Sequence, residues 1–513
     1  MAKGIKKKKM KISELIELSG KSVYPFQGFV FEDSDVSSIE YDSRKTKAGS
    51  LFVAVEGLES DGHDFINDAI KNGCKALVVS SKRGDEFKAL AEKGISLLLS
   101  DDTRKSLSRL AAVFCGNPSK KLHITGVTGT NGKTSITYLL ESVFAECGIN
   151  CAVMGTINYR WGGRQVEALN TTPESREIQY MLRQMADDGV THVILEVSSH
   201  ALELSRVDDV AFDNVIFTNL TGDHIDFHKT MDKYFEAKKK LFDFLDASSK
   251  QNKTAVINLD DNYGKTIISD CRKMDFKTVT FGFHENAEIC ALDESVVNKI
   301  TGLSYDFYDS GIRRTLNLNL AGKFQAHNSL AAYASAINTG LDAKAVCSGL
   351  EKLESVPGRL QVLDPGKGFF IVVDYAHTPD ALLKLLQSVF EMEHNRIITV
   401  FGCGGDRDKT KRPVMGGIAA ANSDFAIVTS DNPRTEDPEK IIENILAGIK
   451  TENYMAKSDR EKAIERAVNM AQAHDIIVIA GKGHEDYQII GKSKSHFNDR
   501  EIALKYANMR ELN

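Results

Sequence analysis

Short apolar runs alternate with amphipathic segments along almost the whole chain, and this alternation constrains the fold more than any other feature. In the first 120 residues the runs are "LFVAV" (51–55), "ALVV" (76–79) and "SLLL" (96–99), and helical spacing from Asp64 to Asn72 separates the first two. Strands that alternate with helices form parallel sheets whose faces the helices cover. The sequence therefore predicts an α/β fold.

The chain has 513 residues, which is too long for a single hydrophobic core. Two breaks interrupt the alternation, at "GNPSK" (116–120) and at "SVPGRLQ" (355–361). We therefore expect three domains, at residues 1–120, 121–356 and 357–513. In the last of them we expect strands at "FFIVVD", "IITVF", "FAIVT" and "IIVIA", each of which runs into a polar loop.

Charge and composition exclude several classes of protein. The 65 basic and 71 acidic residues leave a net charge of -6, so no broad basic field would attract nucleic acid. No window approaches the roughly 18 apolar residues of a membrane span, so we expect no stable membrane association. The basic run at 6–9 is typical of a solvated tail. Eight scattered cysteines without a C-x-x-C pair predict a reduced, cytoplasmic protein in which Cys403 is a packing residue.

The segment "GVTGTNGKTS" (126–135) lies between an apolar strand and a helix. Glycines in such a loop let backbone N–H groups approach phosphate oxygens, a lysine bridges phosphates, and a hydroxyl can bind Mg²⁺. The loop departs from the general pattern because Val127 stands where the first glycine is expected. A purely structural turn is the alternative. The predicted ATP-binding residues of the loop are Gly129, Thr130, Asn131, Gly132, Lys133, Thr134 and Ser135.

Two further strands deliver acidic and imidazole side chains. Glu196 ends the strand in "THVILEVSSHAL". The strand in "VIFTNLTGDHIDFH" is followed by Asp223, His224, Asp226 and His228. Oxygen and nitrogen ligands at strand ends beside a phosphate loop suit a phosphate-bound Mg²⁺. Alternatively, Glu196 caps the following helix and the histidines lie on the surface.

The helix predicted in "KTMDKYFEAKKKLFDFL" carries a lysine in an unfavourable place. Lys238 falls inside the apolar stripe, whereas Lys239 and Lys240 fall outside it. A buried ammonium group must extend to solvent, pair with a carboxylate or lose its charge. A neutral amine can take up CO₂ as a carbamate, which would be an anionic metal ligand. Periodicity alone favours extension to solvent or an ion pair.

Taken together, the motifs resemble those of one family, the ATP-dependent Mur ligases. In chain order they include "DSRKTKAGSLFVAVEG", "DGHDF", "GVTGTNGKTS", "NTTPE", "EVSSHAL", "YFEAKKKLF", "GKFQAHNSLAA", "VPGRL", "DYAHTPDAL", "FGCGGDRDKTKRP", "DNPRTEDP" and "GKGHEDYQ". The resemblance implies an N-terminal α/β uridine-binding domain, a central P-loop ATPase domain with a mostly parallel sheet, and a Rossmann-like C-terminal domain. It also implies a monomer that adds meso-2,6-diaminopimelate to UDP-N-acetylmuramoyl-L-Ala-D-Glu, with L-lysine or another diamino acid as the alternative.

The resemblance also assigns roles to individual residues. The catalytic residues that it implies are Lys133, Glu196, His224 and Lys238. It implies two Mg²⁺ ions held by Thr134, Glu196, His224 and a carbamate on Lys238. The ATP site would be completed by Asn328, Arg359 and Asp374. The UDP-linked substrate would contact Ser43, Thr171, Thr172, Ser198 and Arg206. Some relatives have glutamine where Leu204 stands, so that contact is not carried over.

Four loops of the last domain ("DYAHTPD", "GCGGDRD", "SDNPR" and "GKGHE") follow strand ends and should converge on one site. A guanidinium grips a carboxylate bidentately, and meso-diaminopimelate has a second carboxylate that lysine lacks. We expect Arg434 on that carboxylate, Arg407 on the other and Glu485 on an ammonium group. The amino-acid-binding residues that the resemblance implies are Arg407, Asp431, Asn432, Pro433, Arg434, Gly481 and Glu485.

Two other classes fit the sequence less well. A GTP-binding switch would read guanine through an N-K-x-D motif, and "NKIT" (298–301) lacks the aspartate. A folate polyglutamylating ligase would share the chemistry, but the uridine-binding pattern near the N-terminus argues against it.

Overall fold

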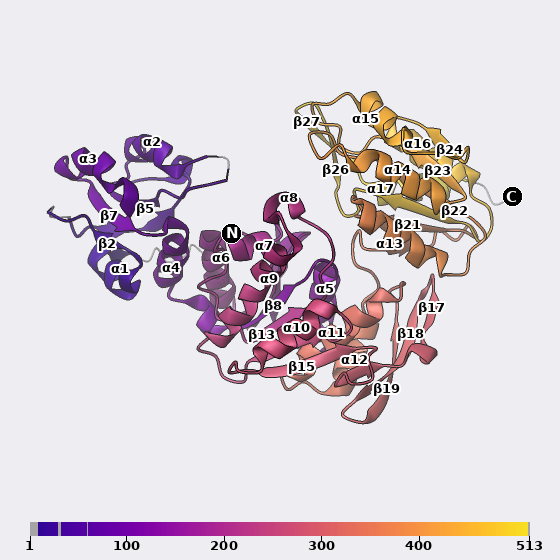
Figure 1. The fold of residues 1–513 in the computed structure, drawn as a ribbon, viewed down its shortest axis with the longest axis horizontal. Helices are drawn as coiled ribbons and strands as arrows, with labels where there is room; N and C mark the ends of the chain where they lie inside the picture. Colours follow the sequence, from indigo (N-terminus) through magenta and orange to yellow (C-terminus); the bar gives the residue numbers. More distant parts are fainter. Residues whose placement is uncertain (1–8, 29–31, 59, 511–513) are drawn as a thin grey trace. The chain divides into compact units, whose positions relative to one another are not determined.

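The structure is a computed structural model that describes residues 9–28, 32–58 and 60–510 (Figure 1). Of the basic run at 6–9, all but Lys9 lies outside the described residues. The chain divides into two compact units, Met1–Lys133 with Cys147–Val279 and Thr134–Glu146 with Thr280–Asn513. Within the described ranges, no helix has the length and apolarity that crossing a bilayer requires.

A five-stranded sheet opens the first unit, in the order β2-β7-β6-β5-β4. Strands β4 to β7 are parallel, and β2 is antiparallel to β7. The strands are β2 (Tyr24–Pro25), β4 (Ser38–Glu40), β5 (Ser50–Val53), β6 (Ala76–Ser80) and β7 (Ser96–Ser100). A separate pair joins β1 (Met10–Lys11) to β3 (Asp35–Val36). The helices are α1 (Ile12–Leu18), α2 (Ile66–Lys71), α3 (Lys88–Glu92) and α4 (Thr103–Cys115).

The three strands predicted in this region are confirmed as β5, β6 and β7, but the predicted helix differs in extent. It begins at Ile66 and not at Asp64, because a 3-10 turn at Gly62–Phe65 precedes it. The carboxylate of Asp61 caps that turn by accepting from the His63 N–H at 3.0 Å. The cap sets a tighter turn before the α-helix can start.

The larger sheet of the first unit runs in the order β11-β10-β9-β12-β8-β13-β14-β15. Its strands are β8 (His123–Thr128), β9 (Cys151–Met154), β10 (Asn158–Trp161), β11 (Arg164–Glu167), β12 (His192–Glu196), β13 (Asn214–Phe217), β14 (Thr254–Asn258) and β15 (Lys277–Gly282). Strands β9, β12, β8, β13 and β14 are parallel, whereas β10 and β11 form an antiparallel extension. The helices are α6 (Ser175–Asp187), α7 (Ser199–Glu203), α8 (Ile225–His228), α9 (Met231–Asp246) and α10 (Asn262–Cys271).

The second unit begins within β15 and also contains α5 (Lys133–Glu146) from Thr134 onward. Its first part is antiparallel, because β18 (Gly302–Asp309) pairs with β16 (Ile289–Ala291), β17 (Val297–Lys299) and β19 (Ile312–Leu318). Two helices follow, α11 (Phe324–Ile337) and α12 (Ala343–Glu351). The Ser142 hydroxyl of α5 donates to the Gly349 carbonyl of α12 at 2.6 Å, so α5 packs beside these helices.

The second unit ends in a six-stranded sheet in the order β20-β21-β25-β22-β23-β24. Its strands are β20 (Gln361–Leu363), β21 (Phe370–Asp374), β22 (Ile397–Phe401), β23 (Phe425–Val428), β24 (Tyr454–Ala456) and β25 (Ile476–Ala480). All are parallel except β20. This order confirms the four strands predicted for the region. The β26–β27 hairpin (Tyr487–Ile490 and Ser493–His496) follows β25.

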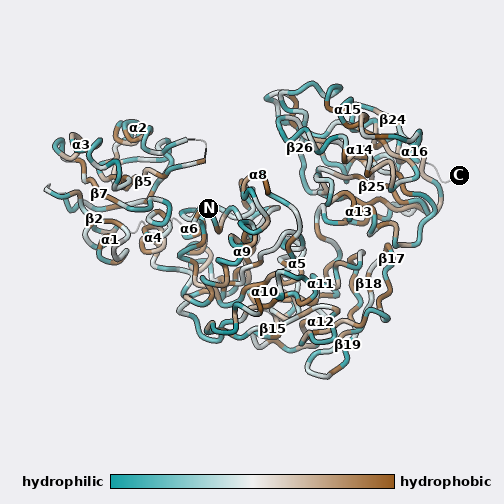
Figure 2. The backbone as a smooth tube through the Cα atoms, in the orientation of Figure 1, coloured by the Kyte–Doolittle hydropathy of each residue, from teal (hydrophilic) through white to brown (hydrophobic). Residues whose placement is uncertain are grey.

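Helices cover both faces of this last sheet. One core cluster includes residues of α13 (Pro379–Phe390), α14 (Lys411–Ala421) and α15 (Pro438–Leu446). The other includes residues of α16 (Arg460–Met470) and α17 (Asp499–Met509). Hydrophobic residues run along the strands between these layers, as at β25 (Figure 2). A doubly wound parallel sheet of this kind places its ligand sites at the carboxyl ends of the strands.

Candidate active site

The carboxyl end of β8 lies between the carboxyl ends of β12 and β13. In the parallel register Glu196 pairs with Val127, and Phe217 pairs with Thr128. The loops after the three strands therefore leave the sheet as neighbours, although they lie far apart in the sequence. This edge brings together the phosphate loop, Glu196 and the segment that carries His224.

The phosphate loop is held against the loop after β13. Gly129 has a φ of +145°, and a Cβ there would lie 1.8 Å from Thr218 Oγ1, so this close approach requires glycine. The Thr130 N–H donates to the Asn219 carbonyl at 2.8 Å. Lys133 folds back and donates from Nζ to the Gly129 and Thr130 carbonyls at 2.9 and 3.0 Å. A cation therefore lies directly on the loop.

The other loop residues continue this arrangement. The Asn131 N–H donates to Asn219 Oδ1 at 3.0 Å, and Gly132 has a φ of +92°. Thr134 and Ser135 are buried in the first turn of α5. Each of the seven residues predicted to bind ATP in this segment thus lies in the turn between β8 and α5 or in the first turn of that helix.

Glu196 is 1% exposed at the end of β12. Its Oε1 accepts from the Thr156 N–H at 2.9 Å, and its Oε2 accepts from the Thr156 hydroxyl at 2.9 Å. Ser198 caps α7, because its Oγ accepts from the Ala201 N–H at 3.2 Å. The alternative in which Glu196 caps that helix is therefore wrong.

His224 has a left-handed backbone, with a φ of 54°. Its ring meets the His200 ring edge-on at 4.8 Å, and its Nε2 lies 3.5 Å from Asp223 Oδ2. Burial lowers the pKa of His224, and Lys133 and Lys238 lower it further against the opposing effect of Asp223. A neutral imidazole with this pKa can act as a ligand at neutral pH.

His228 lies beside His200, with their ring centroids 5.6 Å apart. It is buried, and its Nε2 lies 2.9 Å from Ser199 Oγ. The alternative that the histidines lie on the surface is therefore wrong for His228, whereas the His224 side chain is 46% exposed, as that alternative predicts. Among the described residues, no three His, Cys, Asp or Glu side chains come together as a metal site. Glu196 and His224 would need phosphate, hydroxyl or carbamate oxygens to complete one.

Lys238 is 1% exposed on α9, as its place in the apolar stripe predicts. Its Nζ donates to the Gly129 carbonyl at 2.8 Å and lies 4.6 Å from the centroid of the Tyr234 ring. Of the described residues, no carboxylate forms an ion pair with it. Burial lowers the pKa of Lys238 far below its ordinary value, and Lys133 lowers it further. Extension to solvent and carboxylate pairing are both wrong, and burial at this position favours the neutral amine.

Four of the residues predicted to bind the UDP-linked substrate lie close together. The Thr172 hydroxyl donates to the Glu196 carbonyl at 2.8 Å and accepts from the Ser198 N–H at 3.0 Å. The Arg206 guanidinium donates to the Thr172 carbonyl at 3.1 Å. The Thr171 and Thr156 hydroxyls are 3.1 Å apart. These residues therefore border the Glu196 side of the edge.

Ser43 lies apart from that group, in a short 3-10 turn after β4. Ser43 is buried, and its backbone carbonyl accepts from Asn72 Nδ2 at 2.9 Å. The Asp42 carboxylate caps the turn by accepting from the Arg44 N–H at 3.1 Å. Ser43 is thus held in a loop at the five-stranded sheet.

In the second unit, two of the three remaining ATP candidates lie together. Asp374 ends β21, and its carboxylate accepts from the Leu360 and Ala376 N–H groups at 2.6 and 2.8 Å. Burial raises the pKa of Asp374, while Arg359 opposes that rise. Arg359 lies over the Tyr375 ring at 5.1 Å.

Asn328, the third ATP candidate, is buried in α11. Its Nδ2 donates to Gln325 Oε1 at 2.8 Å, one helical turn earlier. The structure therefore shows the Asn328 amide engaged within its own helix.

The residues predicted to bind the amino acid lie where the loops after β22, β23 and β25 meet. Arg434 has a φ of 51°, and its guanidinium donates to the Gly405 carbonyl at 2.8 Å. A Cβ on Gly404 would lie 3.0 Å from Arg434 Nη1, so the two loops are in close contact. Arg407 is exposed, and its guanidinium donates to the adjacent Asp406 carbonyl at 3.0 Å.

The loops after β23 and β25 are also in contact. Asn432 Nδ2 donates to Glu485 Oε2 at 2.9 Å. A Cβ on Gly481 would lie 2.6 Å from Asp431 Oδ2. A Cβ on Gly405 would lie 1.9 Å from the Pro433 carbonyl oxygen. The structure therefore brings the predicted amino-acid-binding residues into one region of the second unit.

Two residues of this region bear on the sequence prediction. Lys482, which the prediction omits, has a 0% exposed side chain between Asn432 and Glu485. Its position three residues before Glu485, directly after a buried strand, is the signal that could have identified it. Burial raises the pKa of the Cys403 thiol to about 12, and its Sγ lies 3.7 Å from Met415 Sδ, as expected of a packing residue.

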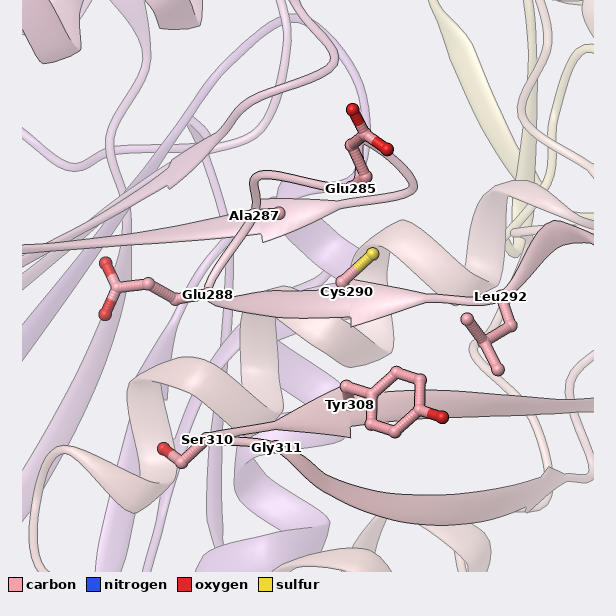
Figure 3. A pocket seen from close by; sticks show the side chains of 8 residues that line it. All are labelled: Glu285, Ala287, Glu288, Cys290, Leu292, Tyr308, Ser310 and Gly311. Carbon is pink, nitrogen blue, oxygen red and sulfur yellow. The ribbon is translucent and has the colours of Figure 1, made fainter.

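A hollow of about 490 Å³ lies elsewhere, on the antiparallel strands of the second unit. Figure 3 shows its lining, in which the carboxylates of Glu285 and Glu288 point in different directions and Cys290 and Tyr308 lie on adjacent strands. None of the predicted site residues lines it. Because its polar groups do not converge, it is not the functional site.

Three family models match the chain. They are the Mur ligase family, catalytic domain, over residues 35–114; the Mur ligase middle domain over 127–336; and the Mur ligase, glutamate ligase domain, over 358–483.

Curated relatives match over nearly the full length. The UDP-N-acetylmuramoyl-L-alanyl-D-glutamate--2,6-diaminopimelate ligase of Geobacter metallireducens is 44% identical over 486 residues, covering 91% of this chain and 93% of its own. Ligase 1 of that name from Clostridium acetobutylicum is 42% identical over 474 residues, which cover 92% of this chain and 95% of the relative.

Solved structures agree with this similarity. A structure of a UDP-N-acetylmuramoyl-L-alanyl-D-glutamate--2,6-diaminopimelate ligase has a TM-score of 0.68 at 32% identity and covers 95% of this chain and 99% of its own. MurF from Acinetobacter baumannii shares the fold, with a TM-score of 0.63 at 17% identity. The match covers 93% of this chain and 96% of the MurF chain.

Proposed function

The chain belongs to the Mur ligase family, with its three-domain fold, and from this premise we propose that it joins meso-2,6-diaminopimelate to the D-glutamate of UDP-N-acetylmuramoyl-L-Ala-D-Glu. The reaction consumes ATP, releases ADP and phosphate, and serves peptidoglycan precursor synthesis. The observation that carries the proposal is the contact between the loops of Arg434 and Glu485, which offers a guanidinium and a carboxylate to one amino acid. Relatives that are 41 to 44% identical are named for this activity.

The reaction begins with activation of a poor electrophile. The γ-phosphoryl group of ATP passes to the terminal D-glutamate carboxylate, giving an acyl phosphate and ADP. The amine of the incoming amino acid attacks the acyl carbon, a tetrahedral intermediate forms, and phosphate leaves as the amide closes. Backbone N–H groups of the phosphate loop would bind the phosphates. Lys133 Nζ would exchange its two carbonyl partners for phosphate oxygens.

The phosphate-loop edge has donors that suit Mg²⁺. Glu196 supplies a buried carboxylate, His224 an imidazole with a lowered pKa, and Thr134 a hydroxyl next to Lys133. When bound, two Mg²⁺ ions would neutralise charge on the transferring phosphoryl group. Lys238 has the low-pKa amine that carbamate formation needs, and the carbamate would be a further anionic ligand.

The remaining assignments follow the same proposal. In the second unit, Asn328, Arg359 and Asp374 would bind ATP. Ser43, Thr171, Thr172, Ser198 and Arg206 would hold the UDP-linked substrate. We infer a cytoplasmic monomer without stable membrane association, because ATP and nucleotide-linked precursors are cytoplasmic compounds. Light scattering of the purified protein measures the monomer directly.

Phosphate release tests the function. The assay contains ATP, Mg²⁺ and UDP-N-acetylmuramoyl-L-Ala-D-Glu, with meso-diaminopimelate, L-lysine or L-ornithine added in turn. We expect the highest kcat/KM with meso-diaminopimelate and an amide product by mass spectrometry. Equal or better turnover with L-lysine would contradict the specificity, and no turnover with any of the three would contradict the ligase itself.

A further inference from the structure

Lys482 is a buried cation in the amino-acid region. It follows β25, its side chain is 0% exposed, and its Nζ donates to Asn432 Oδ1 at 3.0 Å. The same Nζ lies 3.3 Å from Glu485 Oε2 and 5.6 Å from the centroid of the Tyr487 ring. Removing an ammonium group from water is unfavourable unless its partners compensate. The buried position of Lys482 therefore depends on its contacts with Asn432 and Glu485.

The Asn432 amide is oriented by its neighbours. Its Oδ1 accepts from Lys482 Nζ and from the Ile489 N–H, the latter at 2.9 Å. A backbone N–H can only donate, so the atom that it reaches must be the oxygen. The amide nitrogen then donates to Glu485 Oε2 at 2.9 Å. Asn432 therefore reaches the amino-acid region through Glu485.

The two oxygens of Glu485 have different environments. Lys482 and Asn432 both reach Oε2, whereas Oε1 accepts no hydrogen bond from the described residues. The side chain is 16% exposed, so it is neither sealed inside the protein nor fully hydrated. One oxygen is held by the protein, and the other is left for a ligand donor.

We propose that Lys482 is a positioning residue, which with Asn432 holds Glu485 Oε2 so that Oε1 binds the ammonium group of the incoming diamino acid that does not enter the amide bond. This role rests on the proposed function. It differs from the role of Arg434, because lysine and meso-diaminopimelate both carry a second ammonium group. Loss of Lys482 should therefore weaken the binding of both amino acids to a similar extent.

The charge of Lys482 also affects the ionisation of Glu485. Burial raises the pKa of Glu485, the nearby Asp431 raises it further, and Lys482 lowers it. Tyr375 and Arg460 also interact electrostatically with Glu485. Without Lys482 the pKa of Glu485 should rise further, so the acidic limit of ammonium binding should move to higher pH.

Lys482→Met tests the proposal in the full-length protein, with Lys462→Met as a matched control. Lys462 also pairs with a glutamate three residues later, Glu465, at 2.9 Å, but on the exposed surface of α16. We expect Lys482→Met to raise the KM for meso-diaminopimelate and for L-lysine by about tenfold to a hundredfold, as loss of a charge-assisted hydrogen bond implies. The KM for ATP and all parameters of Lys462→Met should stay within about twofold of wild type.

In Lys482→Met, we also expect the acidic limb of kcat/KM for the amino acid to shift to higher pH. A merely structural role of Lys482 would not produce this shift. If Lys482→Met is not folded by circular dichroism, Lys482→Gln replaces it: its neutral amide can still donate to Asn432 and support the fold, while the loss of charge should still shift the acidic limb. An unchanged KM and pH profile in the folded variant would overturn the role of Lys482. An equal rise in the KM for ATP would also overturn it. A wild-type protein without amino-acid-dependent phosphate release would instead overturn the proposed function and this role with it.

Discussion

Lys238 is the residue whose buried state most directly predicts a chemical modification. Its amine contacts the Gly129 carbonyl, and its pKa is lowered by burial. Replacing Lys238 with alanine removes the amine that we propose carries a carbamate and should lower kcat by about 100-fold or more, because charge at the phosphoryl group would no longer be compensated. Steady-state phosphate release measures the loss. Added acetate or formate, which can supply a carboxylate in the space left by the side chain, should restore part of the rate.

Lys240 provides the control for that experiment. It lies two residues away on the same helix and pairs with Glu203 at the surface at 2.6 Å. Lys240→Ala should retain the wild-type rate, since exposed pairs contribute only about 0 to 1 kcal/mol. A Lys238→Ala variant with the wild-type rate and no response to acetate would exclude the carbamate from the mechanism.

Arg434 should determine the choice between meso-diaminopimelate and L-lysine. Lysine would leave its guanidinium without a carboxylate, which costs about 1 to 3 kcal/mol for a buried polar group. Arg434→Ala should therefore reduce the ratio of kcat/KM values for the two amino acids by about 5-fold to 150-fold. Arg466→Ala, an exposed arginine on α16, is the control. An unchanged ratio in Arg434→Ala would place the second carboxylate elsewhere.

At the scale of elements, the sequence allowed the strands and the phosphate loop to be predicted because their signals are local. The stripe of α9 likewise located Lys238, but its partner Gly129 lies 109 positions away, and no periodicity connects the two. The sequence left Glu196 as a possible cap of α7 for the same reason, because only the fold shows Thr156 beside Glu196 and Ser198 at the cap. Lys482 escaped prediction because its partner Asn432 comes from another loop.

The pair of Arg460 and Asp499 joins α16 to α17, and both side chains are 0% exposed. Arg460 also donates to the Ser430 and Ala480 carbonyls at 3.4 and 3.1 Å, near the ends of β23 and β25. Asp499→Ala leaves a buried guanidinium unpaired and should lower the free energy of unfolding by about 3 to 5 kcal/mol, measured by urea denaturation. Lys505→Ala, which removes an exposed pair, should cost about 0 to 1 kcal/mol.

Two histidines at the amino ends of β8 and β12 predict that the free energy of unfolding depends on pH. The His123 and His192 rings are 4.8 Å apart, and burial, with His123 adding to it, lowers the pKa of His192 to about 4. The folded state thus binds fewer protons than the unfolded state between pH 4 and about 6.5, so the free energy of unfolding should fall as pH falls through this window.

Urea denaturation at about pH 7 and about pH 5 measures this dependence. The free energy of unfolding of His192→Gln should fall between these pH values by on the order of 1 kcal/mol less than that of wild type. His496→Gln is the control. The pKa of His496 is raised by Glu501, so its contribution has the opposite sign, and its removal should not reduce the acid sensitivity. An unchanged loss in His192→Gln would exclude this residue as the cause.

At the scale of the whole molecule, each of five hydrophobic clusters formed by the described residues lies within one compact unit. Three of the described clusters consist of residues of the first unit, and the other two consist of residues of the second. The breaks predicted at "GNPSK" and "SVPGRLQ" rest on local composition, whereas this division depends on which residues touch. Local composition could not indicate that α5 packs with α12, because that contact joins segments about 200 residues apart.

Separate clusters predict that heating unfolds the protein in more than one step, so differential scanning calorimetry should resolve at least two transitions. ADP with Mg²⁺ binds only folded protein, and at about 100 times its Kd it should stabilise the transition that involves the phosphate loop by about 2.7 kcal/mol. The transition that does not involve the loop should shift less. Lys133→Ala removes the cation on the loop and should abolish most of the shift, while its transitions without nucleotide stay near those of wild type. A single transition that moves as a whole with nucleotide would contradict the independence of the clusters.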